Sequence, residues 1–441
     1  MKATILEKIY AWILIVILGG IVLHAPLSVG FGTLFPDYDL LIKSWKEILM
    51  LVATVLAVVI VSRRQLWGEL SKDIIFRLIA AYGALHLVLA MLFYGSTVQT
   101  VAGLAIDLRY VLFFSLAYVL IKIVPGYRKV LLQVGVAGAI VVVGFAVVQL
   151  FLPPDILKYI GYGKDTIQPY LTVDLNHEFI RVNSTLRGPN PLGAYVGIVL
   201  GCLAAVWVSG RSVLAGTKNK VIVGLGIIAS LIALWITYSR SALAAAVIII
   251  GVVVATSAAK YLTRRTWITL GVVAVALAGT LFLVRDSTFV SNILLHENPN
   301  GGSATTSNDG HVDSVVAATD KIAEQPLGAG IGSTGSASLY GDKPFIIENQ
   351  YLFIAHEAGW LGLILFLAIF VCIMMRLWRS RQDWLALGVF ASGIGLALIG
   401  LLQPVWVDDT VSIVWWGLAA IAITGGKYAR DTTKQKTTRT S

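Results

Sequence analysis

Residues 311–362 read HVDSVVAATDKIAEQPLGAGIGSTGSASLYGDKPFIIENQYLFIAHEAGWLG, and they contain the two kinds of segment from which the chain is built. A polar, glycine-rich interval ends near Glu348, and a largely apolar run follows it directly. About 20 predominantly apolar residues form a helix long enough to cross the roughly 30 Å hydrocarbon core of a membrane. The stretch therefore predicts a membrane helix whose first turn meets a polar segment outside the membrane.

The composition extends this interpretation to the whole chain. Of its 441 residues 57% are hydrophobic and 13% charged, and the mean hydropathy is +0.82. Soluble domains carry about 25% charged residues, so the fold class is an all-α polytopic membrane protein. We expect about twelve transmembrane helices and a partly helical outer subdomain. The helices are placed at residues 9–29, 45–62, 73–93, 104–123, 128–151, 190–209, 219–238, 240–259, 267–284, 350–376, 384–402 and 411–426.

The polar intervals divide the chain into six expected parts. These are residues 1–151 with helices 1–5, 152–189 as an outer loop, 190–284 with helices 6–9, 285–349 as a large outer subdomain, 350–426 with helices 10–12, and 427–441 as a disordered tail. We expect the first helix to be retained, because no clear signal-peptide cleavage site follows it. Cys202 and Cys372 fall inside predicted helices, so they imply neither a disulfide nor a metal site.

The basic residues predict the orientation. The net charge is +10, and most of the 34 Lys and Arg residues fall in alternate loops and in the tail. The positive-inside rule then places both termini in the cytoplasm and the protein in the cytoplasmic (inner) membrane, in contact with its lipids. No basic patch alternates with exposed aromatic residues, so we expect no nucleic-acid partner.

Two pairs of carboxylates on expected outer loops are weak metal signals. Asp37 and Asp39 form a D-x-D pattern, and Asp408 and Asp409 precede the last helix. Such pairs could hold a divalent cation, but a solvated loop and a helix cap are the more common explanations. We therefore expect no metal and no cofactor.

Arginines near two helix starts predict an anion site. Arg181 and Arg187 precede the helix that begins near Asn190, and Arg240 lies in the tight turn Thr237–Ser241. Exposed backbone N–H groups and guanidinium groups both suit phosphate oxygens, so Arg187 and Arg240 are predicted to clamp a diphosphate. The alternative is that these arginines bind lipid headgroups.

Charged residues inside the fourth helix leave two interpretations open. Asp107 and Arg109 either face a polar bundle interior or extend to the outer interface. Glu348 and Asn349 enter the tenth helix after the glycines of residues 327–333, whose backbone is able to approach a ligand closely. Glu348 is a candidate catalytic residue beside Arg187 and Arg240. The candidate substrate-binding residues are Arg181, Asn190, Arg109, Asn349 and His311.

Four short motifs resemble the O-antigen ligase and polymerase superfamily, which includes pilin oligosaccharyltransferases. In chain order they read RGPNPLG from Arg187, TYSRSA from Thr237, PLGAGIG from Pro326, and NQYL from Asn349 followed by EAG from Glu357. Each is weak alone, but their order and their positions on the outer loops make the resemblance fairly specific. The helix pattern extends it to nearly the whole chain.

The resemblance implies an activity and a set of roles. Members move a glycan from an undecaprenyl-diphosphate carrier to a glycan, lipid or protein acceptor on the outer side of the cytoplasmic membrane. It implies that Arg187 and Arg240 bind the carrier diphosphate. Glu348 stands where the ligases typically have a histidine that meets the acceptor hydroxyl, and His311 or His356 is an alternative. Ligase and polymerase remain equally open. The rival functions are a transporter or flippase of lipid-linked glycans and a non-catalytic scaffold.

Overall fold

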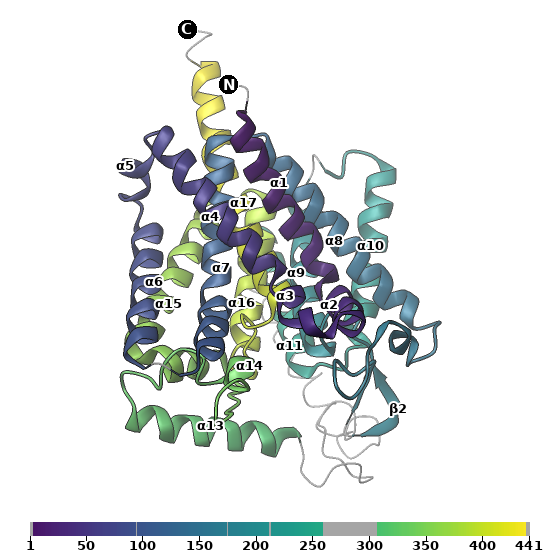
Figure 1. Cartoon of the computed structure of the whole chain (residues 1–441). Coiled ribbons are helices and arrows are strands. Elements are labelled where there is room, and N and C mark those ends of the chain that lie inside the picture. The colour runs from purple at the N-terminus through teal and green to yellow at the C-terminus, as the bar shows by residue number, and fades with distance from the viewer. Residues whose placement is uncertain (1–2, 94, 174, 211–212, 259–306, 438–441) are drawn as a thin grey trace.

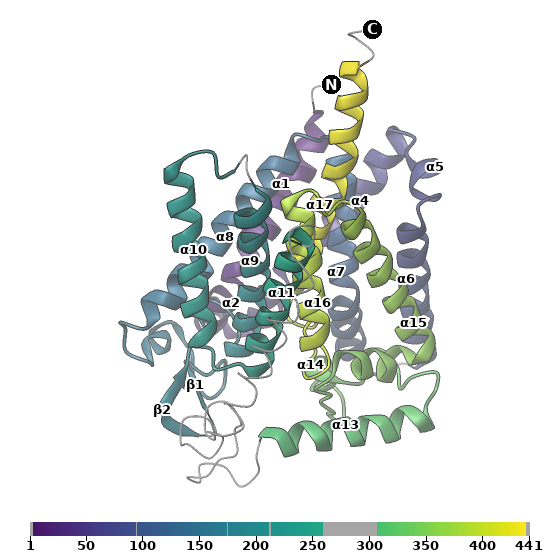
Figure 2. The same cartoon turned by 180° about the vertical axis from the view of Figure 1, so that it is seen from behind.

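Long helices run side by side through the molecule, and the few shorter elements lie at their ends (Figure 1). The computed structural model describes residues 3–93, 95–173, 175–210, 213–258 and 307–437. Helix α1 begins and helix α17 ends at the same end of the bundle, at the top of Figure 1, which we call the terminal end. Helix α13 lies across the opposite end, which we call the α13 end (Figures 1 and 2).

The N-terminal part of the bundle is continuous along the chain. It consists of α1 (Ile5–Gly20), η1 (Ile21–Leu23), α2 (His24–Leu34), η2 (Pro36–Tyr38), α3 (Asp39–Lys43), α4 (Trp45–Arg63), α5 (Trp67–Leu70), α6 (Ile74–Leu92), α7 (Thr97–Ile123) and α8 (Tyr127–Gln149). Apolar side chains on most faces of these helices explain why they stand together in a membrane-sized bundle.

The rest of the described chain alternates long helices with structure at the α13 end. It consists of η3 (Ile156–Ile160), β1 (Leu171–Val173), β2 (Asn176–Arg181), α9 (Pro189–Ser209), α10 (Thr217–Trp235), α11 (Arg240–Ala258), α13 (Ser307–Glu324), α14 (Gly335–Ser338), α15 (Gln350–Arg379), α16 (Trp384–Ile399) and α17 (Asp409–Thr437). Strands β1 and β2 pair in antiparallel fashion.

The predicted fold class is confirmed. Among the described residues, nine helices are long and apolar enough to cross a membrane, and two shorter apolar helices are Trp384–Ile399 and Asp409–Gly425. These account for eleven of the twelve predicted spans. The remaining span, 267–284, lies outside the described residues, as does the segment 285–306 of the expected outer subdomain.

Three local expectations differ from the structure. The expected loop 30–44 is largely helical, because α2 continues to Leu34 and η2 and α3 follow it. The expected outer loop 152–189 contains the β1–β2 hairpin, which an all-helical prediction lacked. Helix α17 continues to Thr437 through most of the tail expected to be disordered, because extending an existing helix needs no new nucleus.

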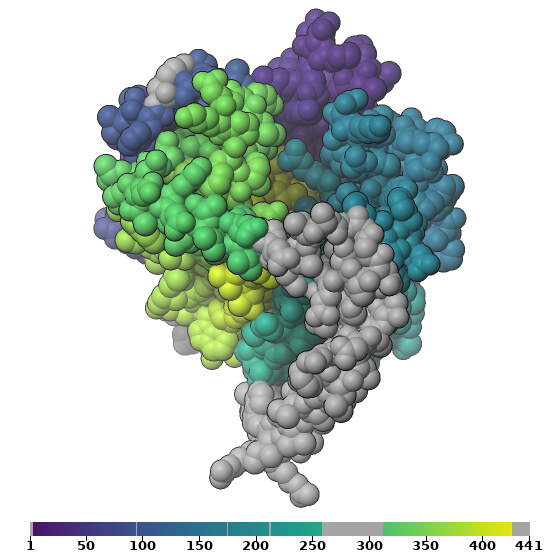
Figure 3. Space-filling model, turned by 90° about the horizontal axis from the view of Figure 1, so that it is seen from below, coloured from purple at the N-terminus to yellow at the C-terminus, as the bar shows by residue number. Residues whose placement is uncertain are grey.

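Helices α7 and α17 pack against each other in the core. Trp406, Trp415 and Trp416 are almost fully buried there, and the Trp415 indole donates to the Val389 carbonyl over 3.1 Å. Figure 3 shows the α13 end. The green segment that contains α13 and the teal segment that contains the β1–β2 hairpin lie on either side of yellow C-terminal residues. The beginning of α17 is therefore held at the centre of this end.

Candidate functional site

The segment between α16 and α17, residues 400–408, joins the elements that carry the predicted site residues, and we call it the α16–α17 connection. It is bound first to the start of α15. The Gln350 amide N–H donates to the Gly400 carbonyl over 2.8 Å, and Gln350 Oε1 accepts from the Trp406 amide over 2.7 Å. Asn349 Nδ2 donates to the Leu401 carbonyl over 2.8 Å. The α15 start is thereby fixed against the connection.

The connection also reaches the turn before α11. Gln403 Nε2 donates to Ser241 Oγ over 2.8 Å. The same turn is tied to the residues before α9, because Arg181 Nε donates to the Thr237 carbonyl over 2.8 Å and Arg181 Nη2 donates to Asn190 Oδ1 over 2.6 Å. The starts of α9, α11, α15 and α17 therefore gather at one place at the α13 end.

Helices α9 and α11 touch closely at their starts. A Cβ atom added at Gly193 would come within 2.6 Å of Ala242 Cβ, a distance that real Cβ atoms do not show. Only glycine at this position lets the first turns approach so closely. Arg187 and Arg240 thus belong to neighbouring, packed segments, as a shared diphosphate clamp requires.

The start of α9 offers few backbone donors, because Pro189 and Pro191 have no N–H and the Leu192 N–H donates to the Gly188 carbonyl over 3.1 Å. Arg187, just before this start, is exposed. Arg187 makes no hydrogen bond or ion pair with any of the described residues. By contrast, Asn349 Oδ1 caps α15 by accepting from Tyr351 and Leu352, and Asp408 Oδ1 accepts from the Val411 amide. A phosphate beside the start of α9 would therefore be bound mainly by the guanidinium group of Arg187.

Asp408 is a carboxyl group in the electrostatic field of Arg187. Burial raises the pKa of Asp408 above its ordinary value, and the charge of Asp409 adds to this rise, whereas Arg187 and Arg109 act to lower it. Burial also raises the pKa of Tyr162, which Arg187 opposes. The charge of Arg187 therefore acts on both the carboxyl of Asp408 and the phenol of Tyr162.

Arg109 lies in a buried ion-pair network. Its Nη1 is 2.6 Å from Asp409 Oδ1 and 3.5 Å from Glu47 Oε1, and its Nη2 donates to the Val407 carbonyl. The side chain is only 4% exposed, so it faces the bundle interior, and the alternative that it extends to the interface is wrong. Its contacts are with protein, and its role as a substrate ligand stays a prediction.

Asp409 holds two further cationic or polar partners in this network. Its Oδ2 lies 2.9 Å from Lys46 Nζ and 2.9 Å from His24 Nε2. The Trp45 indole N–H donates to His24 Nδ1 over 3.0 Å, so Nε2 carries the proton and donates to Asp409. The first residue of α17 is therefore anchored to α2, α4 and α7.

Asp107 belongs to a second buried cluster, on the other side of α7. Its carboxyl lies close to that of Glu357 on α15, and His86 Nε2 lies 3.7 Å from Asp107 Oδ2. Asp107 Oδ2 and Glu357 Oε2 have no hydrogen-bond partner among the described residues. Two carboxyl groups hydrogen-bond only when a proton lies between them. We therefore expect this pair to share one proton.

The glycine-rich turn after α13 packs against protein. Gly328, Gly330 and Gly332 have φ angles of 92°, 100° and 82°. Cβ atoms at these positions would meet Glu357, Phe93 and Gln99 within 2.6 Å. The turn is tied to the buried pair, because the Thr334 amide donates to Glu357 Oε1 over 3.0 Å. Its glycines therefore serve close backbone packing against α7 and α15.

Glu348 directly precedes Asn349, the N-cap of α15, and contacts α13. It is partly buried, and its backbone N–H donates to Ser314 Oγ over 3.0 Å. The ring of the buried His356 faces Phe345, and its Nδ1 has no partner among the described residues. His311 begins the second turn of α13, but its side chain lies outside the described residues.

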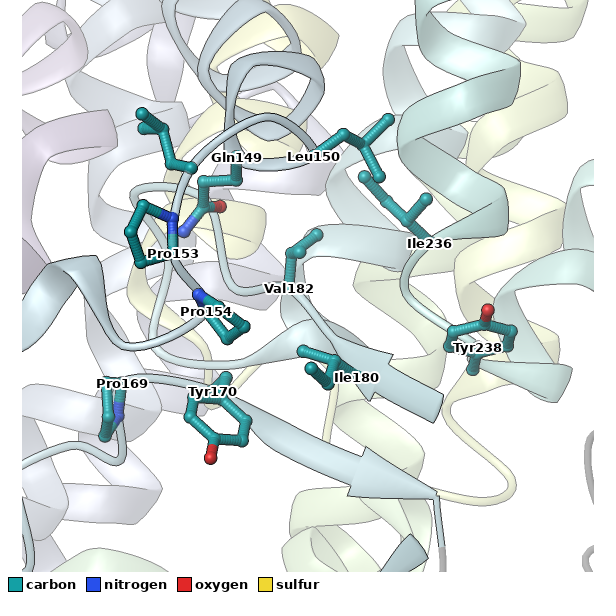
Figure 4. Close-up of a pocket in the computed structure, with 11 residues that line it drawn as sticks. Gln149, Leu150, Pro153, Pro154, Pro169, Tyr170, Ile180, Val182, Ile236 and Tyr238 are labelled. Atoms are coloured by element: carbon teal, nitrogen blue, oxygen red, sulfur yellow. The ribbon is translucent and has the colours of Figure 1, made fainter. Parts of the chain in front are cut away.

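A small pocket of about 170 Å³ adjoins the turn before α11 (Figure 4). Its walls come from the end of α8, the β1–β2 hairpin and the α10–α11 turn, and Figure 4 shows Pro154, Tyr170, Ile180 and Tyr238 around it. The Val182 amide donates to the Ile236 carbonyl over 3.3 Å. This hydrogen bond joins the segment after β2 to the α10–α11 turn, which leads to Arg240.

Several residues of this site were not predicted. His24, Lys46 and Glu47 are polar residues in or beside predicted membrane helices, and that position alone is a signal that such residues face a bundle interior. The α16–α17 connection had no comparable signal, because its contacts are made mainly by backbone groups.

The fold and the site together define a polytopic membrane protein with a charged site at one end of its helix bundle. Residues 225–367 match the family model described as O-antigen ligase, which confirms the resemblance drawn from the motifs. The matched region contains Arg240, the glycine turn and Glu348, whereas Arg187 precedes it. No curated protein matches the chain. The match supports an O-antigen ligase-like membrane glycan transferase.

Proposed function

We propose that the protein transfers a glycan from an undecaprenyl-diphosphate carrier to an acceptor hydroxyl at the outer face of the cytoplasmic membrane. The observation that carries the proposal is the meeting of four helix starts with Arg187 and Arg240 at the α13 end. The terminal end then lies in the cytoplasm, where the basic residues of the loops favour it. The acceptor is a glycan, a lipid or a protein, and ligase and polymerase activities share this chemistry.

The reaction is a single displacement. The acceptor oxygen bonds to the anomeric carbon while the bond from that carbon to the phosphate oxygen breaks, and the diphosphate leaves with the electron pair. Arg187 and Arg240 stabilise the negative charge that grows on the diphosphate. Inversion at the anomeric carbon follows from one displacement.

Glu348 is proposed to take the proton of the acceptor hydroxyl. A carboxylate at the mouth of α15 is able to orient and deprotonate a hydroxyl. Asp408 is the competing carboxylate, because it lies in the field of Arg187. The two roles are separable, because Asp408 also caps α17 through the Val411 amide, whereas Glu348 makes its α13 contact through its backbone.

The test is a transfer assay with purified protein and a radiolabelled undecaprenyl-diphosphate glycan. Arg187→Ala and Arg240→Ala should each abolish product, and Arg→Lys should restore little, because an ammonium group lacks the bidentate fork. The control is Lys164→Ala, which removes an exposed cation of the same outer segment. Normal transfer by folded Arg187→Ala and Arg240→Ala proteins would refute the clamp. A transporter would give no covalent product in this assay at all.

The base is tested by Glu348→Gln and Asp408→Asn in the same assay. We expect Glu348→Gln to keep carrier binding and lose transfer by at least about 100-fold, the lower range for a positioned acid–base group. Near-normal transfer by Glu348→Gln together with loss in Asp408→Asn would assign the proton to Asp408 instead.

A further inference from the structure

A second cavity, of about 500 Å³, lies far from the candidate site, between α15 and α16 near the terminal end. Six residues of α15 form one wall: Phe370, Val371, Met374, Met375, Trp378 and Arg379. Phe390 of α16 closes the other wall. All of these lining residues except Arg379 are apolar, and we call this cavity the acyl groove.

The length of the acyl groove matches one leaflet of a membrane. The lining residues of α15 follow one helix stripe, at spacings of one and three or four residues. From Phe370 to Arg379 the helix rises about 14 Å, at about 1.5 Å per residue. This is about half of the roughly 30 Å hydrocarbon thickness. Val371 and Met375 are about half exposed, so the groove opens sideways towards lipid.

The mouth of the acyl groove carries positive charge that the described residues do not neutralise. Arg379 is exposed and has no hydrogen bond or ion pair within that part of the chain. Arg381 lies 4.3 Å from the Trp378 ring and donates to the Trp378 carbonyl, which leaves most of its N–H groups available. The nearby acid Asp383 is already engaged, because it caps α16 and faces Arg128.

We propose that the acyl groove binds an anionic glycerophospholipid, with one acyl chain along the α15 wall and its phosphate on Arg379 and Arg381. Guanidinium groups bind phosphate oxygens through charge-assisted hydrogen bonds. Basic pockets between helices at the cytoplasmic face are a recurring site for anionic headgroups, and Trp378, beside Arg379, belongs to the residue type that is enriched at membrane interfaces. The groove opens at the end opposite the candidate site, which favours a resident phospholipid over the glycan carrier.

The headgroup contact is tested by native mass spectrometry of the full-length protein released from detergent. The probes are dioleoyl phosphatidylglycerol and, with the same chains but no net charge, dioleoyl phosphatidylcholine. The wild-type protein should bind the anionic lipid more tightly. Arg379→Gln should reduce this preference by about five-fold, which corresponds to the worth of one basic residue near a membrane surface. The matched control is Arg63→Gln, an exposed arginine at the end of α4.

The apolar wall is tested by filling it. Val371→Trp should reduce the binding of both lipids, whereas Val221→Trp, at an exposed position of α10 outside the groove, should not. An Arg379→Gln protein that loses no more preference than Arg63→Gln overturns the headgroup assignment. Equal binding by the Val371→Trp and Val221→Trp proteins overturns the acyl groove as the site. Either result rejects the proposal.

Discussion

Helix α7 contributes to two buried clusters of charged residues, one through Arg109 and one through Asp107. The Arg109 cluster joins opposite charges, because Asp409 is bound by Arg109 and Lys46. The Asp107 cluster joins two acids, and the free oxygens of Asp107 and Glu357 have no donor among the described residues. The first is held by ion pairs, and we expect the second to be held by one shared proton, although the two residues of α7 stand only two positions apart.

The difference shows what each cluster does for the site. The Asp409 cluster fixes the start of α17 to α2, α4 and α7, and therefore fixes Asp408 near Arg187. The Asp107–Glu357 pair fixes the glycine turn, because Glu357 also accepts from the Thr334 amide. One cluster positions the charged part of the site, and the other positions the segment that leads into α15.

The largest effect is expected from removing Asp409, the more deeply buried of the two acids in the ion-pair cluster. Asp409→Asn leaves the buried Arg109 and Lys46 with only the less buried Glu47 as counter-charge, which should lower the free energy of unfolding by about 3–5 kcal/mol. Unfolding in mixed micelles measures this. The control is Asp39→Asn, which breaks the exposed pair with Lys43 and should cost at most about 1 kcal/mol. Equal losses in the two proteins would show that the cluster is not desolvated.

A smaller effect is expected from changing the shape of a cation while keeping its charge. Arg109→Lys retains a partner for Asp409 but cannot also donate to Val407, so it should cost about 1–3 kcal/mol. Arg64→Lys is the control, because Arg64 pairs with Glu7 through a partly exposed guanidinium and should cost less than about 1 kcal/mol. If Arg109→Lys lowers the free energy of unfolding no more than Arg64→Lys does, the two-armed guanidinium group of Arg109 does not have the proposed role.

The sequence predicted the helices well because each span is a local property of some 20 apolar residues. It predicted Arg240 and Glu348 near helix starts for the same reason, since a short polar turn precedes Arg240 and Asn349 follows Glu348 as a helix cap. It left Arg109 between two interpretations, because the answer depends on Asp409, which lies 300 residues further along the chain. The hydrogen bonds of Gln350 and Gln403 to distant segments likewise leave no local pattern.

The smallest effect is expected in the Asp107 cluster, where an amide should replace the shared proton. In Asp107→Asn or Glu357→Gln the amide NH₂ group donates to the remaining carboxylate, so each should change the free energy of unfolding by less than about 1.5 kcal/mol, the upper range for one hydrogen bond. Charged groups around the pair could alter this outcome. His86 on α6 and Arg109 on α7 are the candidates, and the phenols of Tyr82 and Tyr110 lie close by.

Two contrary results are distinguishable by the same measurement. If Asp107 instead formed an ion pair with a charged His86, Asp107→Asn would leave a buried cation and cost about 3–5 kcal/mol, as at Asp409. If both acids were ionised, removal of either charge would relieve their repulsion, and both variants would be more stable than the wild type. The comparison of Asp107→Asn with Asp409→Asn therefore separates a proton-sharing pair from an ion pair, because the two substitutions make the same chemical change in opposite electrostatic settings.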